Sequence, residues 1–178
     1  MQGQFGIHNL LLYKNRDTLR NICSKYCKAA LDTSSEIVLI LTHYDSVKDW
    51  LSYLKDIGIY VEKHKNDGSL IVIESKKGFF SLLNDFVGIM IMIRMLLTRA
   101  KKIGKKGITV IIDMGVFFPD RLEDLIKHES EIFASIRDLK VKVFCNYNKL
   151  DFESLTKKQR QLLLNNHNEI ISIEDNVV

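Results

Sequence analysis

Aliphatic runs recur along this chain with amphipathic stretches between them, and this alternation restricts the folds that the chain can adopt. The clearest run is EIVLILT at residues 36–42. Its near-continuous aliphatic character is typical of a strand that is covered on both faces. Shorter runs predict further strands at residues 8–13, 70–74, 108–112, 141–147 and 170–173. Strands and helices that alternate in this way predict a three-layer α/β sandwich, a mostly parallel sheet with helices on both faces.

The segments between the strands carry apolar residues at helical spacing. Asp17 is the expected cap of a helix that extends to about residue 31, and Asp45 or Ser46 opens a second helix that Gly58 ends. Residues 59–62 are interpreted as a short extended piece. Three further helices are expected over residues 79–103, from 119 or 120 to 136, and over 155–164.

The 178 residues have the size and composition of one globular domain, with 46% hydrophobic and 27% charged residues. We treat residues 1–178 as a single domain because no linker rich in Gly or Pro divides them. The net charge of +4 is too small to indicate nucleic acid binding. The basic cluster at residues 99–106 lacks interleaved aromatic residues and a helix-turn-helix pattern, so we expect no nucleic acid partner.

Charged residues interrupt the longest apolar stretch, residues 79–97, which therefore falls short of a membrane span. We expect no membrane association. The three cysteines, Cys23, Cys27 and Cys145, include no pair at CxxC spacing, and no secretory signal is recognised. A reducing cytoplasm is the simplest compartment for such a chain. Cys23 and Cys27 are four residues apart on one helix face and are predicted core residues.

The motifs of several enzyme classes are missing. Residues 108–113, ITVIID, are similar to a Walker-B strand that ends in an acid, Asp113. However, no GxxxxGK[ST] phosphate loop follows the first strand, and no GxGxxG fingerprint occurs. The chain also lacks a GxSxG elbow, an HExxH pair and a Cys/His zinc spacing. We therefore expect no enzymatic activity, no metal and no cofactor.

Three segments together carry a resemblance to a known family. The first, GIHNLLLYKNRDTL, places His8 at the start of a strand and Tyr13 at its end. The second, LEDLIKHESEIF, offers Glu129 within a helix. The third, VKVFCNYNKLDFESL, runs from a strand through Cys145 and Tyr147 into a short helix. In their order and spacing these segments resemble the MEDS domain, the methanogen/methylotroph sensory domain, over about residues 6–173.

The resemblance implies a RecA/KaiC-like core that has lost its nucleotide loop. It also implies that the chain senses small hydrocarbon derivatives in prokaryotic signalling or transcription. The family's polar positions fall on His8, Glu129, Cys145 and Tyr147. Two positions depart from the pattern: Asp113-Met114 stands where relatives often have Glu-Met, and Asn148 stands where Asp is common.

MEDS domains are often joined to a DNA-binding or kinase domain, which is not recognised in this chain. We therefore expect its output to pass through a signalling or regulatory protein partner, and we expect a homo-oligomer. A small organic ligand would need an apolar cavity with a few aimed polar groups, near the carboxyl ends of the strands. The candidate ligand-binding residues are His8, Tyr13, Asp113, Met114, Glu129, Cys145 and Tyr147.

Several of these assignments have an alternative. Met90, Met92, Met95, Met114, Phe117 and Phe118 are candidates to line a cavity, but a methionine-rich helix is more often part of a plain core. The same alternative holds for His8, Cys145 and Tyr147. A second function is also open, that of a degenerate RecA-like module which, without a small ligand, dimerises or docks on an active KaiC-like ATPase. Its motivation is the predicted helix at residues 86–97, which is apolar on more sides than one sheet face can cover.

Overall fold

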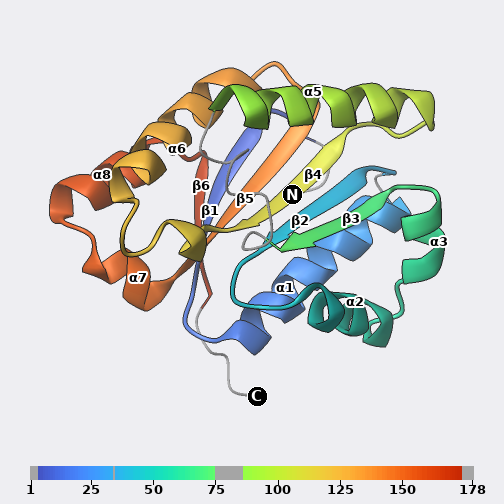
Figure 1. Cartoon of the computed structure of the whole chain (residues 1–178), viewed down its shortest axis with the longest axis horizontal. Helices are drawn as coiled ribbons and strands as arrows, with labels where there is room; N and C mark the ends of the chain where they lie inside the picture. Colours follow the sequence, from blue (N-terminus) through green and yellow to red (C-terminus); the bar gives the residue numbers. More distant parts are fainter. Residues whose placement is uncertain (1–3, 34, 75–85, 174–178) are drawn as a thin grey trace.

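The computed structural model describes residues 4–33, 35–74 and 86–173 (Figure 1). At its centre lies a six-stranded sheet in the order β3-β2-β4-β5-β1-β6. Every neighbouring pair of strands is parallel. The strands are β1 (Ile7–Tyr13), β2 (Ile37–Thr42), β3 (Leu70–Glu74), β4 (Ile108–Asp113), β5 (Val141–Asn148) and β6 (Glu169–Ile173).

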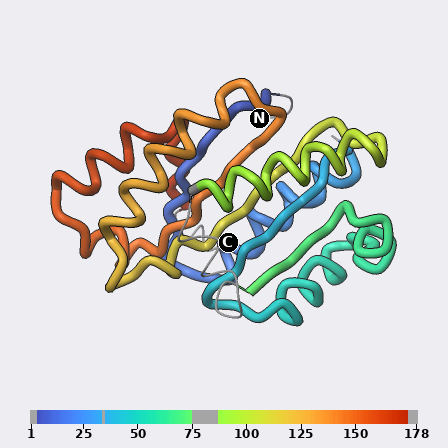
Figure 2. The backbone as a smooth tube through the Cα atoms, turned by 45° about the horizontal axis from the view of Figure 1, so that its top comes forward, coloured from blue at the N-terminus to red at the C-terminus, as the bar shows by residue number. Residues whose placement is uncertain are grey.

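Helices cover both faces of this sheet (Figures 1 and 2), which confirms the predicted three-layer α/β sandwich. One face packs against α1 (Arg16–Lys28), α2 (Val47–Asp56) and α3 (Val61–Asn66). The other face packs against α5 (Phe86–Lys102), α6 (Leu122–Ile136), α7 (Lys149–Ser154) and α8 (Lys157–Asn165). We refer to these as the α1 face and the α6 face.

The position of each strand in the sheet explains its sequence pattern. Every residue of β2 and β4 is buried, because these strands are central and carry helices on both sides. The edge strand β6, by contrast, exposes Ile170. Cys23 and Cys27 on α1 are completely buried on the α1 face, as the sequence predicted.

Two local predictions are wrong. The cap of α1 is Asn15 and not Asp17, because Asn15 still has extended backbone and its side chain accepts a hydrogen bond from Asp17 N at 2.7 Å. The helix then continues as a π-helical turn to Thr33. Residues 59–62 are not extended, since α3 begins at Val61, and its buried residues recur at helical spacing.

The remaining helix boundaries also differ from the predicted ones. The segment predicted as one helix over residues 155–164 begins only at Lys157, after the separate helix α7. A 3₁₀ turn at Met114–Phe117, which the sequence pattern did not predict, precedes α6. The predicted start of the long helix at residue 79 lies outside the described residues. In the described part of the chain, no helix combines the length and apolarity that a bilayer span requires.

A buried ion pair links three strands at their amino ends. Lys142 Nζ on β5 donates to Glu36 Oε1 at 2.6 Å, and Thr109 Oγ1 on β4 donates to Glu36 Oε2 at 2.5 Å. Glu36 is 1% exposed and Lys142 is 6% exposed. Because both carboxylate oxygens have partners, the pair satisfies a charge that burial would otherwise make costly.

We expect Lys142→Met to lower the free energy of unfolding by about 3 to 5 kcal/mol, because it leaves the Glu36 charge buried without its cation. Urea denaturation measures this change. The exposed Lys140→Met is the matched control and should have little effect. The double variant Glu36→Gln, Lys142→Met should recover most of the loss, and a double variant as unstable as Lys142→Met would contradict this account.

Candidate functional site

Five polar side chains meet in the core on the α6 face, and we call them the polar cluster. They are His8 on β1, Glu129 on α6, Cys145 and Tyr147 on β5, and His167 between α8 and β6. His8, Glu129, Cys145 and Tyr147 are 0% exposed, and so is the side chain of His167. Charged and titratable groups are seldom buried this completely unless they have partners or a function.

Strand pairing and helix periodicity bring these residues together. β1 and β5 are neighbours, with Leu10 opposite Cys145 and Leu12 opposite Tyr147. Because side chains alternate along a strand, His8, Cys145 and Tyr147 all face α6. On α6, Glu129 belongs to the buried stripe of Leu125, Ile132 and Ile136, and therefore points at the sheet.

The carboxylate of Glu129 lies at the centre of the cluster. Its Oε2 lies 2.9 Å from His8 Nε2 and 3.3 Å from His167 Nε2. Cys145 Sγ is 3.7 Å from the same oxygen and 3.3 Å from His8 Nε2. The other oxygen, Oε1, accepts a hydrogen bond from the Tyr147 hydroxyl. The rings of His8 and His167 stack with their centroids 4.1 Å apart.

Backbone carbonyls fix the outer nitrogen of each histidine ring. His8 Nδ1 lies 2.8 Å from Asn166 O, and His167 Nδ1 lies 2.6 Å from Leu163 O. A carbonyl oxygen only accepts, so both Nδ1 atoms carry a proton and donate it. Both Nε2 atoms are thereby directed into the cluster.

The histidines determine the ionisation of Glu129. Burial alone would raise its pKa, but the charges of His167 and His8 outweigh burial and hold the pKa of Glu129 well below its ordinary value. For His167, burial acts to lower the pKa, and the Glu129 carboxylate reverses this and raises it. An ionised carboxylate next to charged imidazole is therefore the favoured state of this pair.

The thiol and the phenol of the cluster remain neutral. Burial raises the pKa of Cys145 well above its ordinary value, and the adjacent Glu129 charge raises it further. The pKa of Tyr147 is raised for the same two reasons. His8 lies close to Cys145, as a nucleophile would require, but the Glu129 charge opposes formation of the thiolate. The electrostatic environment of Cys145 is thus unfavourable for cysteine nucleophilic chemistry.

The predicted site residues divide into two groups. His8, Glu129, Cys145 and Tyr147 come together in the polar cluster, and Met114 lies in the core on the same face. Tyr13 and Asp113 do not join them. Tyr13 packs on the α1 face, and its hydroxyl has no hydrogen-bond partner among the described residues.

Asp113 lies at the carboxyl end of β4, apart from the cluster. It accepts hydrogen bonds from Tyr44 N at 3.2 Å and from Gly115 N at 3.1 Å. Burial nevertheless raises the pKa of Asp113 to about 6, more than these backbone donors lower it. Its visible role is to connect the loop after β2 with the turn after β4.

The predicted lining residues also separate. Met90, Met114 and Phe117 are buried in the core, whereas Met95 is 67% exposed on the outer side of α5. The assignment of Met95 to an internal cavity is therefore wrong, because helical rotation carries it away from the sheet.

Sequence reasoning missed His167. No catalytic or metal-binding motif includes this residue, which stands far from the others in sequence. The available signal was Asn166-His167-Asn168, three polar residues immediately before a predicted strand. The structure explains their place: Asn168 N donates to His8 O at 2.6 Å, and Asn168 Oδ1 accepts from His8 N at 2.7 Å.

The raised pKa of Asp113 gives a testable pH dependence. A carboxyl that binds its proton more tightly in the folded state stabilises the fold below its unfolded pKa and loses that contribution as pH rises to about 6. From well below pH 3.8 to well above pH 6, wild type should therefore lose about 3 kcal/mol relative to Asp113→Asn. Denaturant titrations across this range measure the difference. A difference that does not vary with pH, or that the exposed Asp120→Asn reproduces, would refute the assignment.

Comparison with known proteins gives a fold and a family. A crystal structure of a KaiC-like protein from the hyperthermophilic archaeon Pyrococcus horikoshii OT3 is similar in fold, with a TM-score of 0.63 at 12% sequence identity. The match covers 97% of this chain and 76% of that chain. The core is therefore KaiC/RecA-like, as the resemblance implied. No curated protein matches the chain. The family model described as the MEthanogen/methylotroph, DcmR Sensory domain matches residues 7–168, and the chain belongs to this family, MEDS.

Proposed function

We propose that this chain is a non-enzymatic sensory domain that binds a small organic molecule, a hydrocarbon derivative. It passes the signal to a partner protein in prokaryotic signal transduction or transcriptional regulation. The observation that carries the proposal is the polar cluster itself. In a chain of a sensory family, a completely buried set of titratable groups joins β1, β5, α6 and the segment before β6.

The ligand site that we propose is a hollow between α6 and α8. The cluster residues are buried against one another. In this conformation of the protein, a ligand must therefore bind beside the cluster and not within it. The hollow has a volume of about 520 Å³, within the range of small-molecule sites. Its apolar lining comes from Leu122, Ile126 and Leu162.

A short chain of hydrogen bonds connects this hollow to the cluster. Ser130, which lines the hollow, accepts from Asn166 Nδ2 at 2.7 Å. The carbonyl oxygen of Asn166 accepts from His8 Nδ1, and His8 Nε2 lies against Glu129. A ligand that shifts α8 relative to α6 would therefore change the position of both histidines. This connection supports a sensory role for the pair of helices.

The connection between β1 and α1 supports a role without nucleotide hydrolysis. Only Lys14 and Asn15 separate the strand from the helix. A GxxxxGK[ST] phosphate loop needs about eight residues at this point. Asp113, the acid at the end of β4, binds backbone N–H groups instead.

The test is ligand-induced thermal stabilisation across a panel of short-chain alcohols, thiols and halogenated alkanes. At about 100 times its Kd, a true ligand should raise the Tm by about 5 °C or more. Leu162→Trp should abolish this increase because the indole fills the hollow.

Leu150→Trp is the matched control, since Leu150 is 77% exposed and does not line the hollow. This variant should keep the response. A panel without any stabilising compound, or a response that Leu162→Trp retains, would overturn the proposed ligand site.

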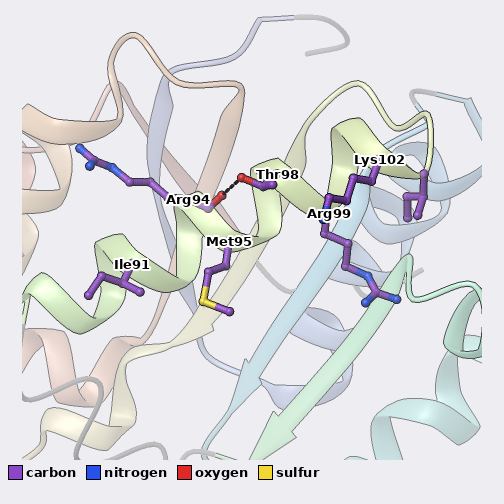
Figure 3. A pocket seen from close by; sticks show the side chains of 7 residues that line it. Ile91, Arg94, Met95, Thr98, Arg99 and Lys102 are labelled. Carbon is purple, nitrogen blue, oxygen red and sulfur yellow. Dashed lines mark hydrogen bonds between the residues drawn. The ribbon is translucent and has the colours of Figure 1, made fainter.

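A specific observation on α5 favours a second candidate, a module that dimerises without a small ligand. Val87, Ile91 and Met95 lie four residues apart on one side of α5 and are 57%, 53% and 67% exposed. Ile91 and Met95 also line a hollow of about 630 Å³ that includes basic residues (Figure 3). An exposed apolar stripe of this kind is typical of an interaction face.

The occupant that we propose for this stripe is a second copy of the chain. Two α5 helices that cross antiparallel at Ile91 bury both stripes about a two-fold axis. The basic last turn of α5, with Arg99, Lys101 and Lys102, then lies at opposite ends of the interface. Like charges are thereby kept apart.

Sedimentation velocity at increasing concentration tests this second candidate. Wild type should form a dimer, and Ile91→Glu should remain a monomer because it places two carboxylates at the two-fold axis. Leu150→Glu, which changes an exposed residue on α7, should leave the dimer intact. A monomeric wild type, or a dimer that persists in Ile91→Glu, would exclude this interface.

A further inference from the structure

Four potential metal ligands converge in the polar cluster. The donor atoms of His8, Glu129, Cys145 and His167 all lie within 4.8 Å of one another. We propose that this cluster binds one divalent transition-metal cation, best fitted by Zn²⁺, through His8 Nε2, His167 Nε2, Cys145 Sγ and Glu129 Oε2. The inference does not depend on the sensory role, because its test measures the cation alone.

The distances between donor atoms fit a tetrahedron. Metal–ligand bonds of about 2.0 to 2.3 Å give tetrahedral edges of about 3.3 to 3.8 Å. The edge from His8 to Cys145 measures 3.3 Å, that from His167 to Glu129 3.3 Å, and that from Cys145 to Glu129 3.7 Å. The edge from His8 to Glu129 is shorter, at 2.9 Å, and needs a shift of a few tenths of an ångström. The two remaining edges, from His167 to His8 and to Cys145, are no longer than 4.8 Å.

The histidine rings have the orientation that metal ligands require. Each Nδ1 donates its proton to a backbone carbonyl, Asn166 O for His8 and Leu163 O for His167. In a neutral ring, Nε2 then carries the lone pair, and it points into the cluster. This use of the outer ring nitrogen is typical of metal-bound histidines. His167 Nε2 is buried and has no hydrogen-bond partner of good geometry among the described residues.

Glu129 and Tyr147 complete the same pattern. Oε2 faces the other three donor atoms, while Oε1 accepts the hydrogen bond of Tyr147. The carboxylate can therefore bind a cation through one oxygen while the other is held in place. Hydrogen bonds to ligating carboxylates orient them in the same way in known metal sites.

A cation also balances the charges of the cluster. Without it, the Glu129 carboxylate lies in a completely buried space, where an ionised group is costly unless a cation or donors reach it. With a divalent cation, neutral imidazoles, the Glu129 carboxylate and a Cys145 thiolate sum to zero. A coordinating thiol is deprotonated by its metal, so the neutral thiol of the metal-free cluster does not oppose binding.

The donor set selects the cation and its role. Two imidazoles, one thiolate and one carboxylate suit a borderline-soft ion such as Zn²⁺ and disfavour Mg²⁺ and Ca²⁺, which prefer oxygen ligands. Four protein ligands fill a tetrahedral coordination sphere and leave no open position. The site is therefore of the structural kind, and it connects β1, β5, α6 and the segment before β6.

The sequence predicted no metal because its ligands lie far apart. Positions 8, 129, 145 and 167 match none of the short spacings of zinc motifs. The parallel pairing of β1 with β5 and of β1 with β6, together with the packing of the buried side of α6 on these strands, brings them together.

The experiment titrates Zn²⁺ or Co²⁺ into the purified, chelator-treated full chain. We expect one equivalent to bind and the Tm to rise. Co²⁺ should give the intense visible bands of tetrahedral coordination and the near-ultraviolet charge-transfer band of a cobalt–thiolate bond. Competition with a chromophoric chelator measures the affinity.

Two variants and two matched controls assign the ligands. Cys145→Ser should remove the charge-transfer band, and His167→Gln should weaken binding by more than about 100-fold, since even outer partners of a ligand contribute 10- to 100-fold. Cys27→Ser and His64→Gln change a buried cysteine and a buried histidine elsewhere and should bind as wild type does. Circular dichroism checks that each variant is folded.

The outcomes decide the proposal. Wild type that binds no stoichiometric Zn²⁺ or Co²⁺ overturns it, and so does a cobalt spectrum without the thiolate band. Binding that survives in folded Cys145→Ser and His167→Gln also overturns it. Where a variant fails to fold, the cobalt spectrum of wild type decides, because no other cysteine lies near histidine and carboxylate donors in the described part of the chain.

Discussion

The carboxylate of Glu129, completely buried beneath α6, is the constraint on which the arrangement around it depends. An ionised carboxylate in such a place is stable only if cations or hydrogen-bond donors reach it. Here they come from β1, from β5 and from the segment before β6. The strand order β5-β1-β6 and the position of α6 above these strands are what bring the three segments within reach.

Three of the buried acids in the described part of the chain are stabilised in three different ways. Glu36 is paired with the Lys142 ammonium group at the amino ends of the strands. Asp113, at the carboxyl end of β4, has backbone donors only, and burial keeps its pKa raised. Glu129 has two histidines, and imidazole is a common ligand of transition metals, unlike the partners of Glu36 and Asp113. The chemistry that each of these three sites can perform is therefore set by the groups that bind the carboxylate, because the carboxylate is common to all three.

The sequence predicted the strands well because continuous aliphatic runs have few alternatives in a covered sheet. The prediction from sequence failed at α3, because a six-residue helix is too short to show a clear period.

The site was predicted in part. His8, Glu129, Cys145 and Tyr147 followed from the family resemblance. Tyr13 was misplaced although strand alternation puts it on the opposite face from His8, five residues earlier. His167 could not be predicted, because its proximity depends on the pairing of β6 with β1.

The pairing of the first strand with the last segment has a consequence for synthesis on the ribosome. His8 lies 160 residues before Asn168, which accepts from His8 N through its side-chain Oδ1 and donates through its own backbone N to His8 O. A chain emerging from its amino end contains β1, α6 and β5 well before it contains His167. Until then Glu129 lacks its second histidine, so the core on the α6 face has a surplus of negative charge relative to its final state. Of the described residues in this last segment, Ile171 and Ile173 are the ones that pack on the α1 face, so the rest of that face can consolidate first.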